Sequence, residues 1–446
     1  MKFSSRVYVP VLLALILSAA IGGWFLWQIK STVFTVESTF KSPVRQMNFL
    51  KKLFPGNEPD RLSSAIQSTA LLKLRQGEIL ELKGEWKLAE NSYTESVNAG
   101  GGVMALKKLA LIQLQRREYD AVKVTIARLK EENPGSEDVM FYEGLLHLIL
   151  GNTEEAGTVF SRNEDSPHSH FGLGLIALVK GENTQALNEM TIAGQGSDPA
   201  IRSYAETIQK AFSEFALFPD GQEIHLQTLL AQALARINQC EIALPILNRV
   251  IAAQDRYRDA WIVKGFCEFT SERSSDALKS LEKAYSLDPE KPETQYFLAR
   301  THAALGDPQN AVTYLQYALL NGFSPESDAR ELLAEYAREL GNTELALEQY
   351  RLLADAKESS LESFERYVNL AISTQNHALD ALSLSKKALL RWPDDSEALT
   401  LAAKAAFSAG LPEDAKKYIE KALKLDPKNP KVLEINAMIT KSSLTN

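Results

Sequence analysis

A small residue recurs about every 34 positions through the second half of this 446-residue chain. Successive members are 34 or 35 residues apart, and another small or polar residue lies twelve positions before each of them. A period of this length marks a structural unit that is repeated along the chain. Because such units contact only their neighbours, the period limits the fold to a stacked solenoid or a similar array. The recurring residues are Ala243, Ala277, Ala311, Ala346, Ala381 and Ala415.

Each repeat has the composition of two amphipathic helices joined by a turn. Apolar residues recur at spacings of three and four, which places them on one face of a helix. Glycine breaks the helix at the turn and proline stops the second helix. Gly306, Gly341 and Gly410 lie five residues before the recurring alanine, and Pro289, Pro393 and Pro427 lie twelve residues after it.

The first half of the chain repeats this pattern less regularly. Ala110, Ala121 and Pro134 predict one degenerate unit with altered spacing. A small residue is needed where paired helices approach most closely, and a single hairpin cannot bury its apolar face without a neighbour. Three other units place glycine and alanine at the offsets seen later in the chain: Gly77, Gly84 and Ala89; Gly144, Gly151 and Ala156; Gly174, Gly181 and Ala186.

The repeat resembles the tetratricopeptide-repeat (TPR) family in its period, its small residues and its closing proline. The best unit begins at Arg258 and continues with Trp261, Gly265, Ala277, Leu281, Ala284 and Pro289. It departs from the family pattern at Lys264 and Glu268, where an apolar and an aromatic residue are usual. The resemblance covers residues 70–429, about ten units. It implies an all-α fold, a right-handed α-solenoid of helical hairpins, here with an N-terminal transmembrane helix.

Residues 7–29 predict that transmembrane helix, because none of these 23 positions is charged. Trp24 and Trp27 suit the head-group level at one end. A cleaved signal peptide is the alternative, since Ser18, Ala19 and Ala20 resemble a cleavage site. Basic residues flank the segment on both sides and leave the orientation of an anchor open, but a cleaved signal, or an anchor whose amino terminus is inside, places the bulk of the chain outside the cytoplasm. We therefore expect a single-pass membrane protein with an N-terminal anchor.

The spacing of the repeats predicts the domain boundaries. Ala186 and Ala243 are 57 residues apart, which is one repeat plus 23 residues, so an irregular helix at 201–223 is expected to join two stacks. The prediction comprises an anchor or signal peptide (1–30), a juxtamembrane linker and entry helix (31–69), an N-terminal stack (70–200), the joint (201–223), a C-terminal stack (224–429), and a capping helix with a tail (430–446).

The matches to catalytic and cofactor-binding motifs lie in sequence contexts that do not suit those functions. Gly172 to Ala177 matches a dinucleotide-binding fingerprint, but no strand precedes it and Gly174 already serves a repeat. His168 and His170 form an HxH pair that predicts a solvated loop more readily than a metal site. The only cysteines, Cys240 and Cys267, form no CxxC motif, and sequence alone leaves their pairing open. We therefore predict no enzyme, no cofactor and no metal.

The resemblance implies a protein-interaction scaffold that binds partner segments, extended or helical, in a concave groove. The net charge of −8 argues against a nucleic-acid partner. We predict a role in bacterial envelope assembly or secretion, and the alternative is a non-catalytic subunit that binds a glycan or lipid intermediate. TPR groove positions of two units supply the predicted site, whose apolar rings are typical of interaction surfaces but could also pack between helices. The site comprises Asp259, Ile262, Phe266, Phe269, Glu293, Tyr296 and Arg300.

Overall fold

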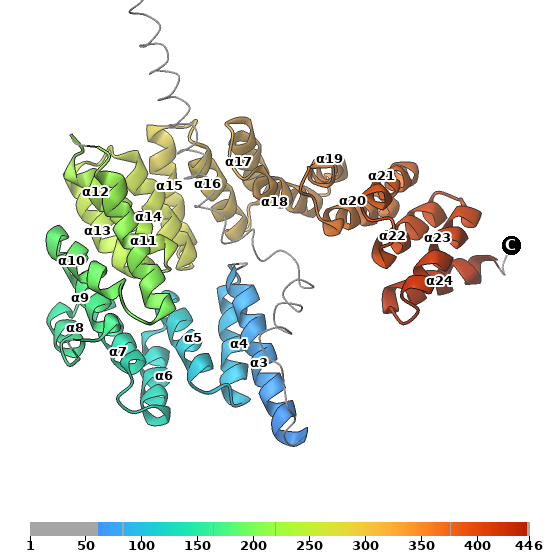
Figure 1. The fold of residues 1–446 in the computed structure, drawn as a ribbon. Coiled ribbons are helices and arrows are strands. Elements are labelled where there is room, and N and C mark those ends of the chain that lie inside the picture. Colours follow the sequence, from blue (N-terminus) through green and yellow to red (C-terminus); the bar gives the residue numbers. More distant parts are fainter. Residues whose placement is uncertain (1–60, 83, 164, 219, 375, 444–446) are drawn as a thin grey trace, which may run out of the picture. The chain divides into compact units, whose positions relative to one another are not determined.

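The computed structural model describes residues 61–443 except 83, 164, 219 and 375, and the regular secondary structure of this part is entirely α-helical. Its 22 helices form two compact units, the first ending at Leu287 and the second beginning at Asp288 (Figure 1). An all-α helical-repeat solenoid is therefore confirmed. The predicted span at residues 7–29 lies outside the described residues. Within them, no helix combines the length and the apolar character that crossing a bilayer requires.

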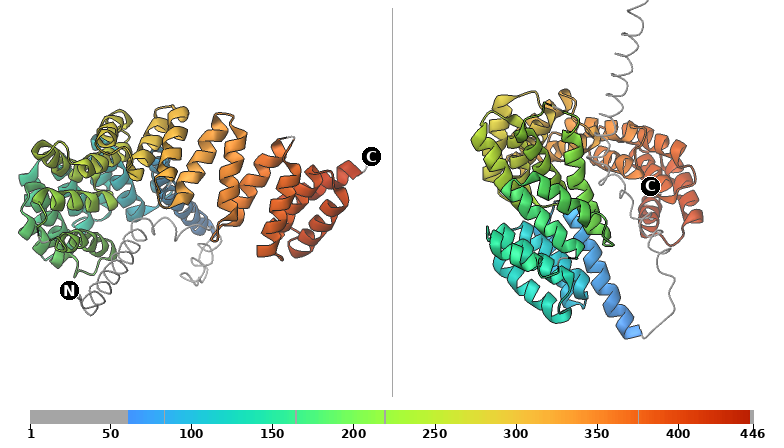
Figure 2. Two further views of the ribbon diagram at one scale, coloured as in Figure 1. Left: turned by 90° about the horizontal axis from the view of Figure 1, so that it is seen from above. Right: turned by 60° about the vertical axis from the view of Figure 1, so that its left-hand side comes forward.

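The first unit consists of six helical hairpins and one unpaired helix. Its helices are α3 (Arg61–Leu82), α4 (Trp86–Asn98), α5 (Gly102–Gln115), α6 (Tyr119–Glu132), α7 (Glu137–Ile149), α8 (Thr153–Phe160), α9 (Pro167–Lys180), α10 (Asn183–Ala193), α11 (Pro199–Phe215), α12 (Glu223–Arg236), α13 (Cys240–Ala253), α14 (Arg258–Thr270) and α15 (Ser274–Leu287). Figure 2 shows these hairpins following one another from blue to yellow.

The second unit contains four hairpins and a final single helix. Its helices are α16 (Pro292–Ala304), α17 (Pro308–Leu320), α18 (Glu326–Glu339), α19 (Thr343–Asp355), α20 (Leu361–Ser373), α21 (Ala378–Arg391), α22 (Ser396–Ser408), α23 (Pro412–Leu425) and α24 (Pro430–Ser443). The buried face of α24 comprises Val432, Ile435 and Ile439, while Leu433 and Glu434 are exposed. This division suits the last helix of a stack, which meets a neighbour on one side only.

The small residue of each repeat lies where the two helices of a hairpin touch. A Cβ atom at Gly265 would lie 2.5 Å from Cγ of Leu281, and one at Gly174 would lie 2.7 Å from Cε of Met190. In both hairpins the large partner follows the glycine by sixteen positions, and Gly144 faces Phe160 in the same way. The expected close approach of the paired helices is therefore confirmed.

The degenerate second hairpin is more regular than the sequence suggested. Val122, which is fully buried, occupies the position that we assigned to Ala121, and Ala121 is only half-buried. The predicted altered spacing is therefore wrong, because Val122 lies twelve residues after Ala110 and twelve before Pro134. Valine fits the buried position that alanine occupies in other repeats. Ala121, one residue earlier, therefore resembled the repeat residue without occupying its position.

The surplus residues before the third quarter of the chain form α11, which packs against α9, α10 and α12 within the first unit. Asp198 caps this helix by accepting hydrogen bonds from the backbone N–H groups of Ala200 and Ile201 at 2.8 and 3.0 Å. Pro199 then occupies the first helical position, where its missing N–H costs nothing.

We predict that limited chymotrypsin treatment of the full chain cuts first in the turn that follows α11. Leu217 and Phe218 are 60% and 50% exposed there, and they lie beyond the end of α11, where a protease can reach the backbone. The expected products are two fragments that separate at residues 218–222, identified by mass spectrometry. Early cleavage at the boundary between Leu287 and Asp288, with this turn intact, would contradict the predicted joint at 201–223.

Candidate protein-binding surface

The first half of the predicted site lies on α14, in the first unit. Ile262 is buried, and Phe266 is half-buried with its ring against the apolar core of this unit. Phe269 is half-buried as well. The carboxylate of Asp259 pairs with the guanidinium of its neighbour Arg258 at 2.7 Å. This row therefore presents two partly accessible rings beside a charged residue.

The second half of the predicted site lies on α16, in the second unit. Tyr296 is buried, and its ring stacks on that of Phe323 with centroids 4.1 Å apart and planes 11° from parallel. The guanidinium carbon of Arg300 lies 5.8 Å from the centre of the Tyr296 ring, at cation–π distance. The carboxylate of Glu293 pairs with Lys291 at 3.0 Å.

The packing of Tyr296 agrees with the alternative that these rings support the stack. Stacking on Phe323 holds the Tyr296 ring between hairpins, so little of its surface is available to a partner. Phe266, Phe269 and Arg300 keep partial exposure. The two rows belong to different units, and their use by one partner stays a prediction.

A charged cluster on α18 and α20 forms a second surface in the second unit. Arg366 of α20 pairs with Glu331 at 2.7 Å and Glu335 at 3.1 Å, both on α18, and with Glu362 of its own helix at 3.0 Å. Although burial alone would lower the pKa of Arg366, the charge of Glu331 and the bond to Glu362 raise it. Because Arg366 belongs to the next hairpin, the residue pattern within one repeat offers no signal for this pairing.

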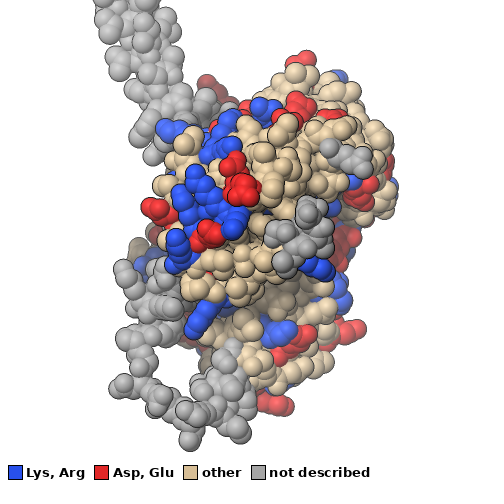
Figure 3. Space-filling model, turned by 90° about the vertical axis from the view of Figure 1, so that its right-hand side faces the viewer, with Lys and Arg blue, Asp and Glu red and all other residues tan. Residues whose placement is uncertain are grey.

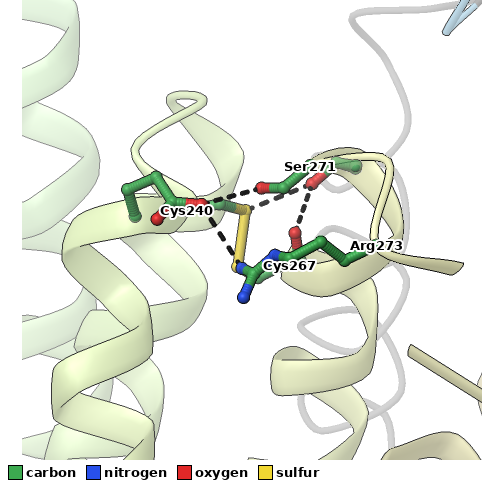
Figure 4. The surroundings of a disulfide bond; sticks show 6 residues. Cys240, Cys267, Ser271 and Arg273 are labelled. Carbon is green, nitrogen blue, oxygen red and sulfur yellow. Dashed lines mark hydrogen bonds and ion pairs between the residues drawn. A yellow bond between two sulfur atoms is a disulfide. The ribbon is translucent and has the colours of Figure 1, made fainter. Parts of the chain in front are cut away.

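A disulfide bond joins Cys240, the first residue of α13, to Cys267 of α14, with Cα atoms 5.0 Å apart (Figure 4). Glu241, beside it, accepts hydrogen bonds from Ser271 Oγ at 3.1 Å and from the Arg273 guanidinium at 3.3 Å. The pairing links two successive hairpins covalently. The cysteines are 27 positions apart with no motif around them, so the sequence offered no signal for the pairing.

The histidine pair does not lie in a solvated loop, as we had expected. Ser166 caps α9 by accepting a hydrogen bond from the His168 N–H, and Pro167 fills the first helical position, so both histidines belong to the first turn. His168 is buried, with Nδ1 3.1 Å from Glu137, and His170 Nδ1 lies 2.8 Å from Glu189. In the described part of the chain, no group of three or more such side chains is arranged to hold a metal ion.

The charges on the surface do not form one large field of a single sign on the face shown in Figure 3. Lysine and arginine side chains are interspersed there with aspartate and glutamate. Nucleic-acid binding requires a basic stripe or patch along one face, and its phosphate contacts dominate affinity. The face shown in Figure 3 carries charges of both signs and no extended basic stripe of that kind.

Comparison with protein families finds tetratricopeptide repeats in three segments of the chain. Residues 228–292 and 296–360 match one model of this description, and residues 374–439 match another. The predicted repeat type is therefore confirmed for these segments. No curated protein matches the chain.

Several solved structures resemble parts of the chain at low identity. YrrB, described as a TPR protein with an unusual peptide-binding site, is 17% identical over 43% of this chain and 97% of that chain, with a TM-score of 0.36. PilW, described as a widely conserved type IV pilus biogenesis factor, is 18% identical over 48% of this chain and 99% of that chain, with a TM-score of 0.34. Yeast Tom70 is 13% identical over 84% of this chain and 96% of that chain, with a TM-score of 0.28.

Proposed function

We propose that this protein is a membrane-anchored adaptor that binds segments of partner proteins on the first helices of its hairpins. The observation that carries the proposal is the run of tetratricopeptide repeats at residues 228–292, 296–360 and 374–439. Proteins built from this repeat generally mediate protein–protein interactions, and the fold is typically a non-catalytic scaffold. The uncharged segment at residues 7–29 supplies the anchor.

We further propose that the repeats lie outside the cytoplasm of a bacterial cell, where the adaptor serves envelope assembly or secretion. The disulfide between Cys240 and Cys267 supports this placement, because such bonds persist in the periplasm and outside cells but are rare in the reducing cytosol. An anchor that enters the membrane with its amino terminus inside gives the same orientation. A reporter fused to the C-terminus tests it: a periplasm-active phosphatase is expected to be active, and a cytosol-active fluorophore dark.

The adaptor function is tested by purifying the tagged full-length protein from detergent-solubilised membranes. Stable protein partners are the expected result, identified by mass spectrometry after crosslinking. A glycan or lipid that co-purifies without any protein would instead support the alternative of a subunit that binds an envelope intermediate. The same preparation lacking residues 1–30 is expected to be soluble and strongly helical by circular dichroism, because the later apolar residues are buried within hairpins.

A variant that combines Phe266→Ala with Arg300→Gln is expected to weaken partner binding about tenfold or more, since aromatic and arginine residues dominate many interfaces. Both side chains are only half-buried, so the stack is expected to remain folded. Tyr317→Ala, which removes a 43% exposed ring from the second helix α17, is the matched control. Wild-type binding by the folded double variant would remove these residues from the site. Tyr296→Phe keeps the stacked ring and removes only the hydroxyl group. Weaker binding by this variant would indicate a contact through the hydroxyl, and unchanged binding would indicate a packing role.

A further inference from the structure

The first unit returns on itself, so that the α5–α6 turn meets hairpins that follow it by more than a hundred residues. The guanidinium of Arg116 pairs with Glu272 at 3.2 Å across 156 positions of sequence. Beside it, Arg117 pairs with Glu241 at 3.4 Å. Helix α13 also packs against α7 and α9, and the Arg249 guanidinium reaches the carbonyl oxygens of Leu178 and Val179.

The backbone at this contact adopts a conformation that favours glycine. Most hairpins place glycine with positive φ five residues before the buried small residue, for example Gly181 at 82° and Gly306 at 79°. Arg117 (61°), Asn238 (59°) and Glu272 (57°) occupy the same position in three other hairpins. Non-glycine residues are strained in this region, and such strain often accompanies a role for the side chain. Arg117 and Glu272 both use their side chains in the contact between the hairpins.

Each of the two ion pairs joins a nearly inaccessible side chain to one that solvent reaches. In each pair one side chain is much less exposed than the other: those of Arg116 and Glu241 are 10% and 9% exposed, while those of Glu272 and Arg117 are 43% and 44% exposed. Burial alone would lower the pKa of Arg116, but the bond to Glu272 and the charges of Glu272, Glu90 and Glu118 raise it. Ions can reach the exposed partners, so added salt screens both pairs.

We propose that Arg116, Arg117, Glu241 and Glu272 form an ionic clasp that opens and closes the contact between the α5–α6 turn and the hairpins α12–α15. The cavity behind the clasp measures about 50 Å³, which is too small for a peptide segment. Its walls include Leu111 and Leu145 on one side and Ile237 on the other. A partner that reaches these side chains binds the open form. Its apparent affinity therefore decreases as the fraction of open molecules decreases. The clasp is a property of the free chain and does not depend on the proposed adaptor function.

Distance measurements between spin labels on the full-length protein in detergent test the clasp without any partner. Labels at Asp120→Cys in α6 and Ser275→Cys in α15 report the separation across the contact, while the native cysteines stay paired. We expect one short distance at 50 mM salt and a growing long-distance population at 1 M salt. The Glu272→Gln variant is expected to show the long population already at low salt, and Glu282→Gln, at an exposed position of α15 outside the clasp, is expected to match the wild type.

The Glu272→Gly variant shows whether the carboxylate or the strained backbone conformation of this residue decides if the contact is closed. It relieves the positive-φ strain and removes the carboxylate together, so it should open the contact although its own turn becomes more favourable. A wild-type distance that does not change between 50 mM and 1 M salt overturns the proposal. A distance in folded Glu272→Gln and Glu272→Gly that equals the wild-type value overturns it as well. Circular dichroism confirms that each variant is folded, and the salt series on the wild type requires no variant.

Discussion

Replacing Gly144 by alanine is expected to lower the free energy of unfolding of the first unit by about 2 kcal/mol. A Cβ atom there would lie 2.5 Å from two carbons of the Phe160 ring, which real contacts do not reach. The ring has little room to move away, because a Cβ atom added at Gly172 of the next hairpin would meet it as closely and Phe160 is only 1% exposed. The hairpin must therefore spread or Phe160 must leave its rotamer.

Gly157→Ala is the matched control for this substitution. Gly157 is also helical, but the nearest atom to its added Cβ would be Cδ1 of Ile176 at 3.9 Å, an ordinary contact. Since alanine favours helix over glycine, this variant is expected to gain up to about 1 kcal/mol. Denaturant titrations of both variants measure the difference. Combining Gly144→Ala with Phe160→Leu should recover part of the loss. If Gly144→Ala were as stable as Gly157→Ala, Phe160 would not be confined between the two glycines.

Loss of the Cys240–Cys267 disulfide is expected to lower the free energy of unfolding of the first unit by about 3–4 kcal/mol. The bond joins residues 27 positions apart, and the chain-entropy relation assigns a loop of about this length that magnitude. Both cysteines are buried, and both hairpins belong to one apolar core. We therefore expect reduction to weaken the unit without abolishing its helices.

Unfolding of the purified protein with and without a thiol reductant measures this effect. The reductant is expected to lower the denaturant midpoint of the wild type and to leave the Cys240→Ala, Cys267→Ala double variant unchanged. Because alanine removes the sulfur atoms, this variant should unfold at or below the midpoint of the reduced wild type. Free thiols on the freshly isolated protein, or a wild-type midpoint insensitive to reductant, would contradict a structural disulfide and remove its support for an extracytoplasmic location.

Local features of the sequence sufficed to predict the hairpins. Each repeat encodes its own hairpin within about 34 residues. The signals are apolar residues at spacings of three and four, the glycine at the turn and the small residue at the helix contact. Helices α11 and α24 overlap the segments in which a surplus helix and a capping helix were expected, while their roles as joint and cap stay predictions. The mistaken assignment of Ala121 arose because valine and alanine both fit a small buried position, and only packing distinguishes them.

The sequence alone determined that the chain forms stacked helical hairpins, since that information repeats along it. Only the tertiary structure decided which distant residues meet. The disulfide joins residues 27 positions apart, Arg366 reaches carboxylates of the preceding hairpin, and Arg116 pairs with Glu272 across 156 positions. Tyr296 is buried because Phe323, from the loop after the next helix, covers its ring. These contacts depend on small rotations between successive repeats, which accumulate along a solenoid and leave no mark on the spacing of any single unit.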